Sequence, residues 1–167
     1  MSQANLILIG PMGAGKSTVG RQLATVLSRE FFDSDHEIER RCGVDIPLIF
    51  EKEGEAGFRS RERAVIAELS QRRAIVLATG GGAVLDPDNR RHLISSGRVI
   101  YLFASVAEQL RRIGTDTHRP LLQAPDPQAR LAELLAQRDP LYRETADQIV
   151  LTDQCQARDV VAQILAQ

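Results

Sequence analysis

Basic clusters and aromatic residues are both scarce in this chain. Its 167 residues include no tryptophan, two tyrosines and five phenylalanines, and the formal net charge is -1 with a pI near 6.3. General binding of nucleic acid needs a basic patch, often with aromatic side chains on which bases stack, and the sequence contains neither. We therefore expect no nucleic-acid partner.

Long apolar runs are absent too. No apolar stretch approaches the ~18 residues that a membrane-spanning helix requires, and the first apolar run starts so early that no signal peptide fits before it. We expect a soluble, cytoplasmic protein with no membrane partner. Cys42 and Cys155 are far apart and lack metal-ligand spacing, so both are expected to be reduced and to play no part in a metal site.

The most informative motif directly follows the first apolar run. Residues 10–18 read G-P-M-G-A-G-K-S-T, the G-x-x-x-x-G-K-[ST] pattern of a phosphate-binding loop between a buried strand and a helix. The glycines bring backbone N–H groups close to an anion, and the helix directs its positive end at the same place. The motif predicts a nucleoside triphosphate bound by Gly13, Ala14, Gly15, Lys16, Ser17 and Thr18.

Short apolar runs alternate with helical patterns along the chain. This regular alternation indicates right-handed βαβ units and a buried parallel sheet, in one domain that covers residues 1–167. The predicted strands are 6–9, 31–32, 74–78, 99–103 and 149–151. The predicted helices are 17–29, 36–42, 46–53, 60–71, 88–96, 106–113, 128–137 and 157–166.

One segment fits neither pattern. Residues 114–127 read G-T-D-T-H-R-P-L-L-Q-A-P-D-P and lie between two predicted helices. A loop of this length inside a compact domain is usually an active-site lid or a disordered insert. Because Arg119 lies in the middle of it, we favour a lid, at about residues 112–127.

Two patterns typical of other phosphate-loop proteins are missing. The N-K-x-D sequence with which switch GTPases read guanine does not occur. The acid that ends an apolar strand in large motor-type ATPases is also missing, because the run 74–78 continues into Thr79 and Gly80. Asp33 and Asp35 instead follow the second predicted strand. These features favour a small phosphotransferase that binds a second substrate at the carboxyl ends of the strands.

Five further motifs are similar to those of the shikimate kinase family. They are F-F-D-S-D at 31–35, G-E-A-G-F-R at 54–59 before Arg61 and Glu62, A-T-G-G-G-A at 78–83, R-P-L-L at 119–122 and R-D-P-L-Y at 138–142. They occur in the family's order and cover nearly the whole chain. The resemblance implies an α/β, three-layer P-loop kinase fold, with a five-stranded parallel sheet in the order 2-3-1-4-5, flanking helices and a mobile lid.

On the nucleotide side, the resemblance assigns a role to each polar residue near the phosphates. It implies that Ser17 and Asp33 hold Mg²⁺, Asp33 through water, although Asp33 is also suited to cap a helix. Lys16 and Arg119 are the expected catalytic cations, with Arg119 reaching the phosphates when the lid closes. Arg112 is expected to stack on adenine. Solvent-exposed positions remain the alternative for both arginines.

On the acceptor side, the resemblance implies that Asp35 binds substrate hydroxyls and is the candidate base for the one that attacks the γ-phosphate. A helix N-cap is the alternative role for Asp35. Arg59 and Arg138 are expected to read a carboxylate, because a guanidinium makes paired hydrogen bonds that lysine cannot. The polar substrate is expected to lie against the backbone of Gly80, Gly81 and Gly82.

The implied reaction is transfer of the γ-phosphate of ATP to the 3-hydroxyl of shikimate, with Mg²⁺ as cofactor and ATP as co-substrate. The products are shikimate 3-phosphate and ADP, on the route to aromatic amino acids. A kinase for another small polyol acid, such as gluconate, is the nearest alternative. A nucleotide-binding regulator that has lost catalysis is the second. A monomer is the family expectation.

Overall fold

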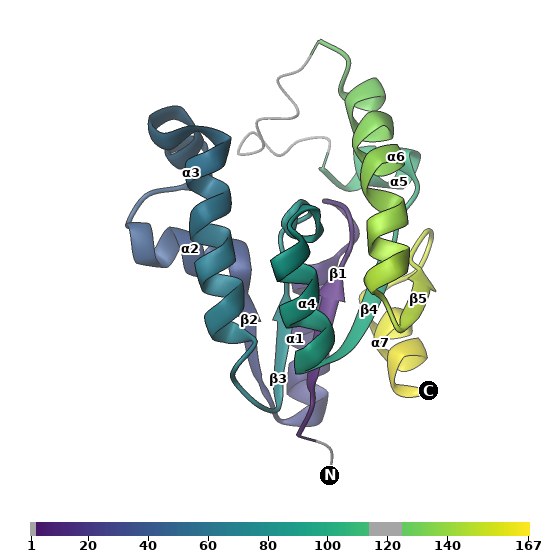
Figure 1. Ribbon diagram of the computed structural model, residues 1–167. Coiled ribbons are helices and arrows are strands. Elements are labelled where there is room, and N and C mark those ends of the chain that lie inside the picture. The colour runs from purple at the N-terminus through teal and green to yellow at the C-terminus, as the bar shows by residue number, and fades with distance from the viewer. Residues whose placement is uncertain (1–2, 114–124) are drawn as a thin grey trace.

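A five-stranded parallel sheet forms the centre of the computed structural model, which describes residues 3–113 and 125–167 (Figure 1). The strand order β2-β3-β1-β4-β5 confirms the expected topology. The strands are β1 (Asn5–Ile9), β2 (Glu30–Asp33), β3 (Ile75–Ala78), β4 (Gly97–Phe103) and β5 (Gln148–Leu151).

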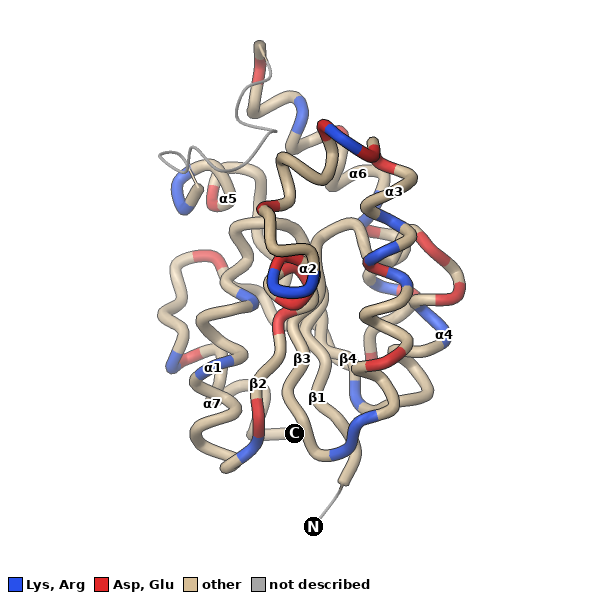
Figure 2. The backbone as a smooth tube through the Cα atoms, turned by 90° about the vertical axis from the view of Figure 1, so that its left-hand side faces the viewer, with Lys and Arg blue, Asp and Glu red and all other residues tan. Residues whose placement is uncertain are grey.

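Helices cover both faces of this sheet, which confirms the three-layer arrangement. Side chains alternate along a strand, so Ile7 and Ile9 pack toward α3, α4 and α6, whereas Leu8 packs toward α1 and α7. Figure 2 shows the two helix layers, with charged residues concentrated on the helices. The helices are α1 (Lys16–Leu27), α2 (Ser34–Cys42), α3 (Ile46–Leu69), η1 (Ala83–Leu85), α4 (Pro87–Ser96), α5 (Val106–Ile113), α6 (Pro127–Thr145) and α7 (Ala157–Leu165).

The strand register brings three loops to one edge of the sheet. Ala78 at the end of β3 pairs with Leu8 of β1 and with Asp33 of β2. Because all strands are parallel, the segments that follow β1, β2 and β3 leave the sheet side by side. These segments are the phosphate loop, the Asp33–Asp35 turn and the glycines at 80–82.

Two helices are longer than the sequence predicts. The predicted helices at 46–53 and 60–71 form one element, α3, which bends at Gly54, where φ is 71° and ψ is -178°. The predicted helix at 128–137 continues to Thr145 through Pro140. Proline lacks the N–H donor and its ring crowds the carbonyl four residues earlier, so it strains one turn of the helix. Beyond it, Tyr142 and Thr145 are buried, and this packing keeps the last turns helical.

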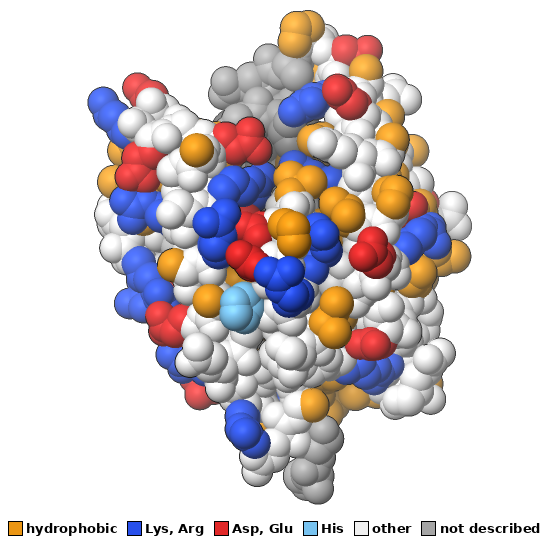
Figure 3. All heavy atoms as spheres, in the orientation of Figure 1, with side chains coloured by type: hydrophobic (Ala, Val, Ile, Leu, Met, Phe, Trp, Pro, Cys, Tyr) orange, Lys and Arg blue, Asp and Glu red, His pale blue; other side chains and the backbone are white. Residues whose placement is uncertain are grey.

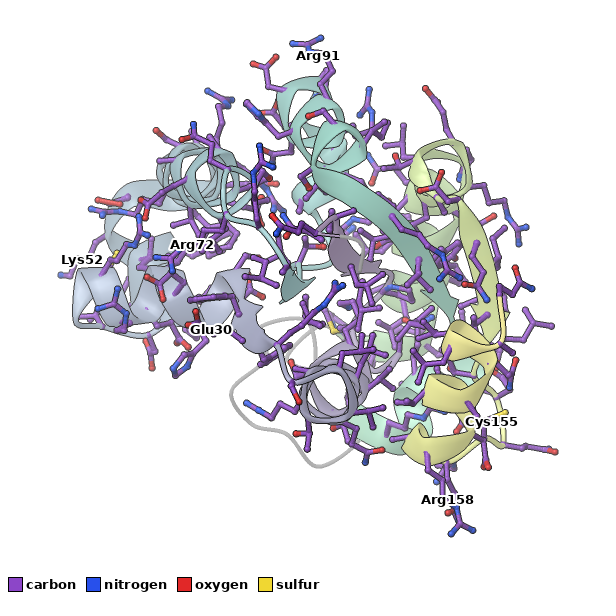
Figure 4. The ribbon with its side chains drawn as sticks, turned by 90° about the horizontal axis from the view of Figure 1, so that it is seen from below. Glu30, Lys52, Arg72, Arg91, Cys155 and Arg158 are labelled. Atoms are coloured by element: carbon purple, nitrogen blue, oxygen red, sulfur yellow. The ribbon has the colours of Figure 1, made fainter. Side chains whose placement is uncertain are left out.

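The central part of the predicted lid, residues 114–124 with Arg119, lies outside the described residues. Arg112 ends up in the last turn of α5, and α6 begins at Pro127. Within the described ranges, no helix is long and apolar enough to cross a membrane. Cys42 and Cys155 are both free thiols, and Cys155 lies at the periphery beside α7 (Figure 4).

Candidate active site

The phosphate loop encloses a cavity of about 420 Å³ at the start of α1. Its glycines adopt backbone conformations that other residues rarely enter, with φ of 79° at Gly13 and 90° at Gly15. The Lys16 ammonium donates to the carbonyls of Gly10, at 2.7 Å, and Pro11, at 2.8 Å. The loop therefore has the shape and the cation that bind phosphates.

Asp33 joins this loop to the second strand and fulfils two geometric roles. Its Oδ2 accepts a hydrogen bond from Ser17 Oγ at 2.6 Å. Its Oδ1 accepts from the N–H groups of Asp35, at 2.9 Å, and His36, at 3.2 Å, and so caps α2. Asp33 therefore caps a helix, the alternative role predicted for it, and also lies beside Ser17 as expected of a metal site. The N-cap of α2 is Asp33, so the capping role predicted for Asp35 is wrong.

The pair Ser17–Asp33 fits a bound Mg²⁺. Among the described residues, no cluster of three or more His, Cys, Asp or Glu side chains is placed to hold a metal by itself. Magnesium usually takes one or two carboxylates from the protein and completes its shell with water and substrate phosphates. A hydroxyl and a carboxylate 2.6 Å apart beside the phosphate loop suit that pattern.

A second, larger cavity of about 670 Å³ adjoins the first. Asp33, Asp35, Gly80 and Gly81 line both of them. The lining of this cavity brings together every residue predicted for the acceptor side: Asp35, Arg59, Gly80, Gly81, Gly82 and Arg138. Outside the cavity, Figure 3 shows basic and acidic side chains side by side on the face that carries α3, α4 and α6.

Asp35 stands at the boundary between the two cavities. Burial raises its carboxyl pKa from 3.8 to about 7, and the nearby carboxylates of Asp33 and Glu62 act in the same direction. Lys16 and Arg59 oppose this shift. Asp35 Oδ1 is shielded from solvent and has no hydrogen-bond partner among the described residues. A carboxyl group with a pKa near neutrality is suited to proton transfer.

Arg59 is held by Glu62, an acid to which the sequence analysis assigns no role. Its Nη1 donates to Glu62 Oε1 at 2.8 Å, and Glu62 is only 1% exposed. Burial raises the pKa of Glu62, while Arg59 and Arg138 lower it. The Nε groups of both arginines are buried and have no hydrogen-bond partner in the described part of the chain, although Glu55 Oε1 lies 3.6 Å from Arg59 Nε. Buried polar groups are normally paired, so these donors suit a polar ligand.

The glycines at 80–82 follow β3 and pass close to all three charged groups. A Cβ on Gly80 would lie 2.5 Å from Asp35 Oδ1, and one on Gly81 would lie 3.4 Å from Arg138 Nη1. A Cβ on Gly82 would collide with the Arg59 guanidinium. A side chain at position 80 or 82 would therefore displace the acid or the Arg59 guanidinium, whereas a Cβ at position 81 would only contact Arg138.

Arg112 was predicted to contact the nucleotide, whereas Phe50 and Phe58 had no role assigned from the sequence. Arg112 lines the nucleotide cavity and donates to the carbonyls of Gly13, at 2.9 Å, and Thr152, at 2.7 Å. Its stacking on adenine stays a prediction. Phe50 and Phe58 both line the acceptor cavity, with ring centroids 4.9 Å apart. The arginines labelled in Figure 4, Arg72, Arg91 and Arg158, lie away from both cavities.

Two residues of the recognised motifs have contacts that the sequence did not predict. Ser34 Oγ accepts from the Gly80 N–H at 3.1 Å, and Tyr142 Oη donates to the Gly81 carbonyl at 2.6 Å. Their only signal in the sequence was position, because Ser34 lies between two acids and Tyr142 follows Arg138 by one helical turn.

Comparison with known proteins gives one consistent family. The shikimate kinase family model matches residues 12–167. The shikimate kinase of Acinetobacter baylyi is 58% identical over 161 residues, which cover 96% of this chain and 89% of that protein. The structure of shikimate kinase from Acinetobacter baumannii in complex with shikimate has a TM-score of 0.95 at 56% identity, and the match covers 98% of this chain and 91% of that one.

A gluconokinase from Sinorhizobium meliloti is more distant. It has a TM-score of 0.59 at 19% identity, over 98% of this chain and 90% of that one, and this likeness shows a shared fold alone. The phosphate loop, the two adjoining cavities and the close relatives together show that the chain belongs to the shikimate kinase family and is an ATP-dependent kinase.

Proposed function

We propose that the protein transfers the γ-phosphate of ATP to the 3-hydroxyl of shikimate, giving shikimate 3-phosphate and ADP. The observation that carries this proposal is the position of Asp35 on the wall shared by the nucleotide and acceptor cavities. A hydroxyl bound to Asp35 faces the phosphates, and Arg59 and Arg138 line the acceptor cavity with it. This arrangement fits a compact ring acid that carries hydroxyls and one carboxylate.

The chain's own residues supply binding, orientation and proton transfer. The guanidinium groups of Arg59 and Arg138 hold the carboxylate by paired hydrogen bonds and so fix the ring. Asp35 orients the attacking hydroxyl and accepts its proton as the new O–P bond forms and the bond between the γ-phosphorus and the ADP oxygen breaks. Because phosphoryl transfer has a loose transition state, the orientation of the hydroxyl contributes as much as proton removal.

On the nucleotide side, Lys16 and the loop N–H groups hold the phosphates. Ser17 and Asp33 are the residues that would hold Mg²⁺, which neutralises phosphate charge when bound. Arg112 lines the nucleotide cavity and donates to Thr152, and we assign it to stacking on adenine. We assign residues 112–127 to a lid and Arg119 to the phosphates, by resemblance to the family.

Gluconate as acceptor is the alternative on the same fold, and a nucleotide-binding regulator is the alternative of another class. Neither is favoured by a specific contact. A cavity lined by Arg59, Arg138 and three glycines suits a compact carboxylated ring, and the presence of Lys16, Ser17, Asp33 and Asp35 in the lining of the nucleotide cavity supports a catalytic role for them. We further propose that the enzyme works in the cytoplasm as a monomer, as its composition and family indicate.

The proposal is tested by incubating the purified protein with ATP, Mg²⁺ and shikimate. ADP release should require shikimate, and two-dimensional ¹H–³¹P NMR should show phosphorus coupled to the proton on carbon 3. Release of ADP at the same rate without shikimate, or a phosphate on another hydroxyl, would contradict the assignment. Binding of ATP without any transfer would support the regulator.

A further inference from the structure

The glycine loop at 80–82 has no side chains with which to hold its own position. It nevertheless lies against Asp35, Arg59 and Arg138, where a Cβ on Gly80 or Gly82 would collide and one on Gly81 would lie in contact with Arg138. Glycine backbones have the largest conformational freedom of all residues. Backbone bonds from Ala83 N–H to the Gly80 carbonyl and from Leu85 N–H to the Gly82 carbonyl, each 3.1 Å long, fix part of the loop, whereas the Gly80 N–H and the Gly81 carbonyl have side-chain partners. The groups that fix this loop therefore help to set the shape of the acceptor site.

Two side chains from opposite sides of the loop provide fixed hydrogen bonds. Ser34, in the first turn of α2, accepts from the Gly80 N–H at 3.1 Å. Tyr142, in α6, donates to the Gly81 carbonyl at 2.6 Å. Ser34 is fully buried and Tyr142 is 1% exposed, so both hydroxyls are shielded from solvent, although the bond to Gly81 is only partly buried.

Each of these residues lies on the same helix as a residue of the acceptor site and close to it. Ser34 directly precedes Asp35, so the serine hydroxyl and the carboxylate are carried by the same turn of α2. Tyr142 follows Arg138 by four residues in α6 and therefore lies on the same face of that helix. The loop is thus tied on one side to the element that carries the acid and on the other to the element that carries an arginine.

The tyrosine is itself well fixed. Its ring packs against the ring of Tyr101, with centroids 4.8 Å apart, and this contact does not involve the Tyr101 hydroxyl, which donates to Asp139 at 2.6 Å. Burial raises the pKa of Tyr142 to about 12, so its hydroxyl keeps the donor proton at neutral pH. The bond to Gly81 is consequently present throughout the pH range in which the enzyme would work.

We propose that Ser34 and Tyr142 are positioning residues for the acceptor, which set the distance of the glycine loop from Asp35 and Arg138. This inference rests on the proposed function, because it concerns the fit of shikimate in that site. The loop touches the acceptor cavity more extensively than the nucleotide cavity, since Gly82 lines only the former. Loss of either bond should therefore weaken shikimate binding selectively.

The kinetic test uses Tyr142→Phe and Ser34→Ala, with Tyr101→Phe as the matched control. The control removes the same hydroxyl from the neighbouring ring, whose partner is Asp139 and not the loop. In Tyr142→Phe and Ser34→Ala, the KM for shikimate should rise about fivefold, the effect of one buried hydrogen bond, while the KM for ATP should stay within about twofold. Tyr101→Phe should leave both values unchanged.

Hydrogen exchange in the free protein provides a readout that needs no activity. Tyr142 does not touch the Gly80 amide, so faster exchange of that amide in Tyr142→Phe, and not in Tyr101→Phe, would show that the loop moves as a unit. Unchanged Gly80 exchange in Tyr142→Phe would overturn the proposal, as would a KM for shikimate that stays constant in both variants. If the wild-type enzyme fails to phosphorylate shikimate, the proposed function is wrong. The exchange result alone then decides whether Ser34 and Tyr142 hold the glycine loop in place.

Discussion

Ser17 Oγ donates to Asp33 Oδ2 across 2.6 Å and so joins the first turn of α1 to the end of β2. The other oxygen of the same carboxylate caps α2. One acid therefore supports both the fold and the expected metal site, and its two oxygens divide these tasks. A substitution that removes the charge of Asp33 but keeps a hydrogen-bond acceptor can distinguish the metal-binding role from the capping role.

Asp33→Asn removes the charge but keeps an oxygen that can cap α2. We expect the Mg²⁺ concentration needed for half-maximal rate to rise at least about tenfold, because a neutral amide is a weaker partner for the ion. The melting temperature of the free protein should change little. Asp33→Ala should lose the cap as well, at a cost of about 1 kcal/mol. An unchanged Mg²⁺ requirement in the asparagine variant would remove Asp33 from the metal site.

Lys16→Met tests the cation in the phosphate loop. We expect kcat to fall by about 100-fold or more, as is typical when one preorganised electrostatic group is lost. Stability should fall by only about 1 kcal/mol, because the two hydrogen bonds to loop carbonyls are partly exposed. Lys52→Met, on the outer side of α3, is the matched control and should leave activity unchanged (Figure 4). A large loss of apo stability in Lys16→Met would make this lysine structural.

The raised pKa of Asp35 predicts a pH dependence of activity. If the ionised carboxylate accepts the proton, kcat/KM for shikimate should rise with pH and level off above about 7, the pKa of this group in the free protein. Steady-state rates between pH 5 and pH 9, flanking that value, would measure it. A flat profile across that range would mean that Asp35 only positions the hydroxyl.

The same shift has a consequence for stability with a defined sign. The folded-state pKa of about 7 lies above the ordinary value of 3.8, so the folded protein binds a proton more tightly than the unfolded chain. The contribution of Asp35 to stability is full below pH 3.8 and is lost as the pH rises through about 7. Asp35→Asn should therefore be more stable than the wild type at pH 8, by at least about 1 kcal/mol, and this advantage should shrink toward pH 4.

Arg59→Lys keeps the charge but loses the planar pair of donors. We expect the KM for shikimate to rise about tenfold or more, with the KM for ATP nearly unchanged. Arg63→Lys, one turn further along α3 and paired with Asp86, is the control that should behave as the wild type. The methyl ester of shikimate is the complementary probe. If wild-type enzyme phosphorylated it as well as the acid, Arg59 would not be a carboxylate reader.

The parts of the fold that follow local rules were predictable. The phosphate loop has a strand before it and a helix after it, and Asp33 ends the second strand, as expected from the apolar pattern. The sequence predicts two separate helices, at 46–53 and 60–71, on either side of the bend at Gly54. In the structure, the helix resumes at once, and the ion pair between Glu53 and Arg61 spans the bend. A pattern of residue types does not show that such a pair forms.

Contacts between distant elements were not predictable from the sequence. The bond from Gly80 to Ser34 joins residues 46 positions apart, and the bond from Tyr142 to Gly81 joins residues 61 positions apart. The pairing of Arg59 with Glu62 has a local spacing of three residues, yet its burial depends on the packing of α3. Motifs identified which residues meet at the site, and packing determined which of them hold the others in place.

The choice of acceptor is the central claim, and the ratio of kcat/KM for shikimate to that for gluconate tests it most directly. The two acids differ in shape, because shikimate is a compact ring that fixes its carboxylate and hydroxyls relative to one another, whereas gluconate is an open chain. We predict a ratio above about 1,000, since the site would leave buried polar groups unpaired with the wrong acid. Equal values for the two acids would contradict the account.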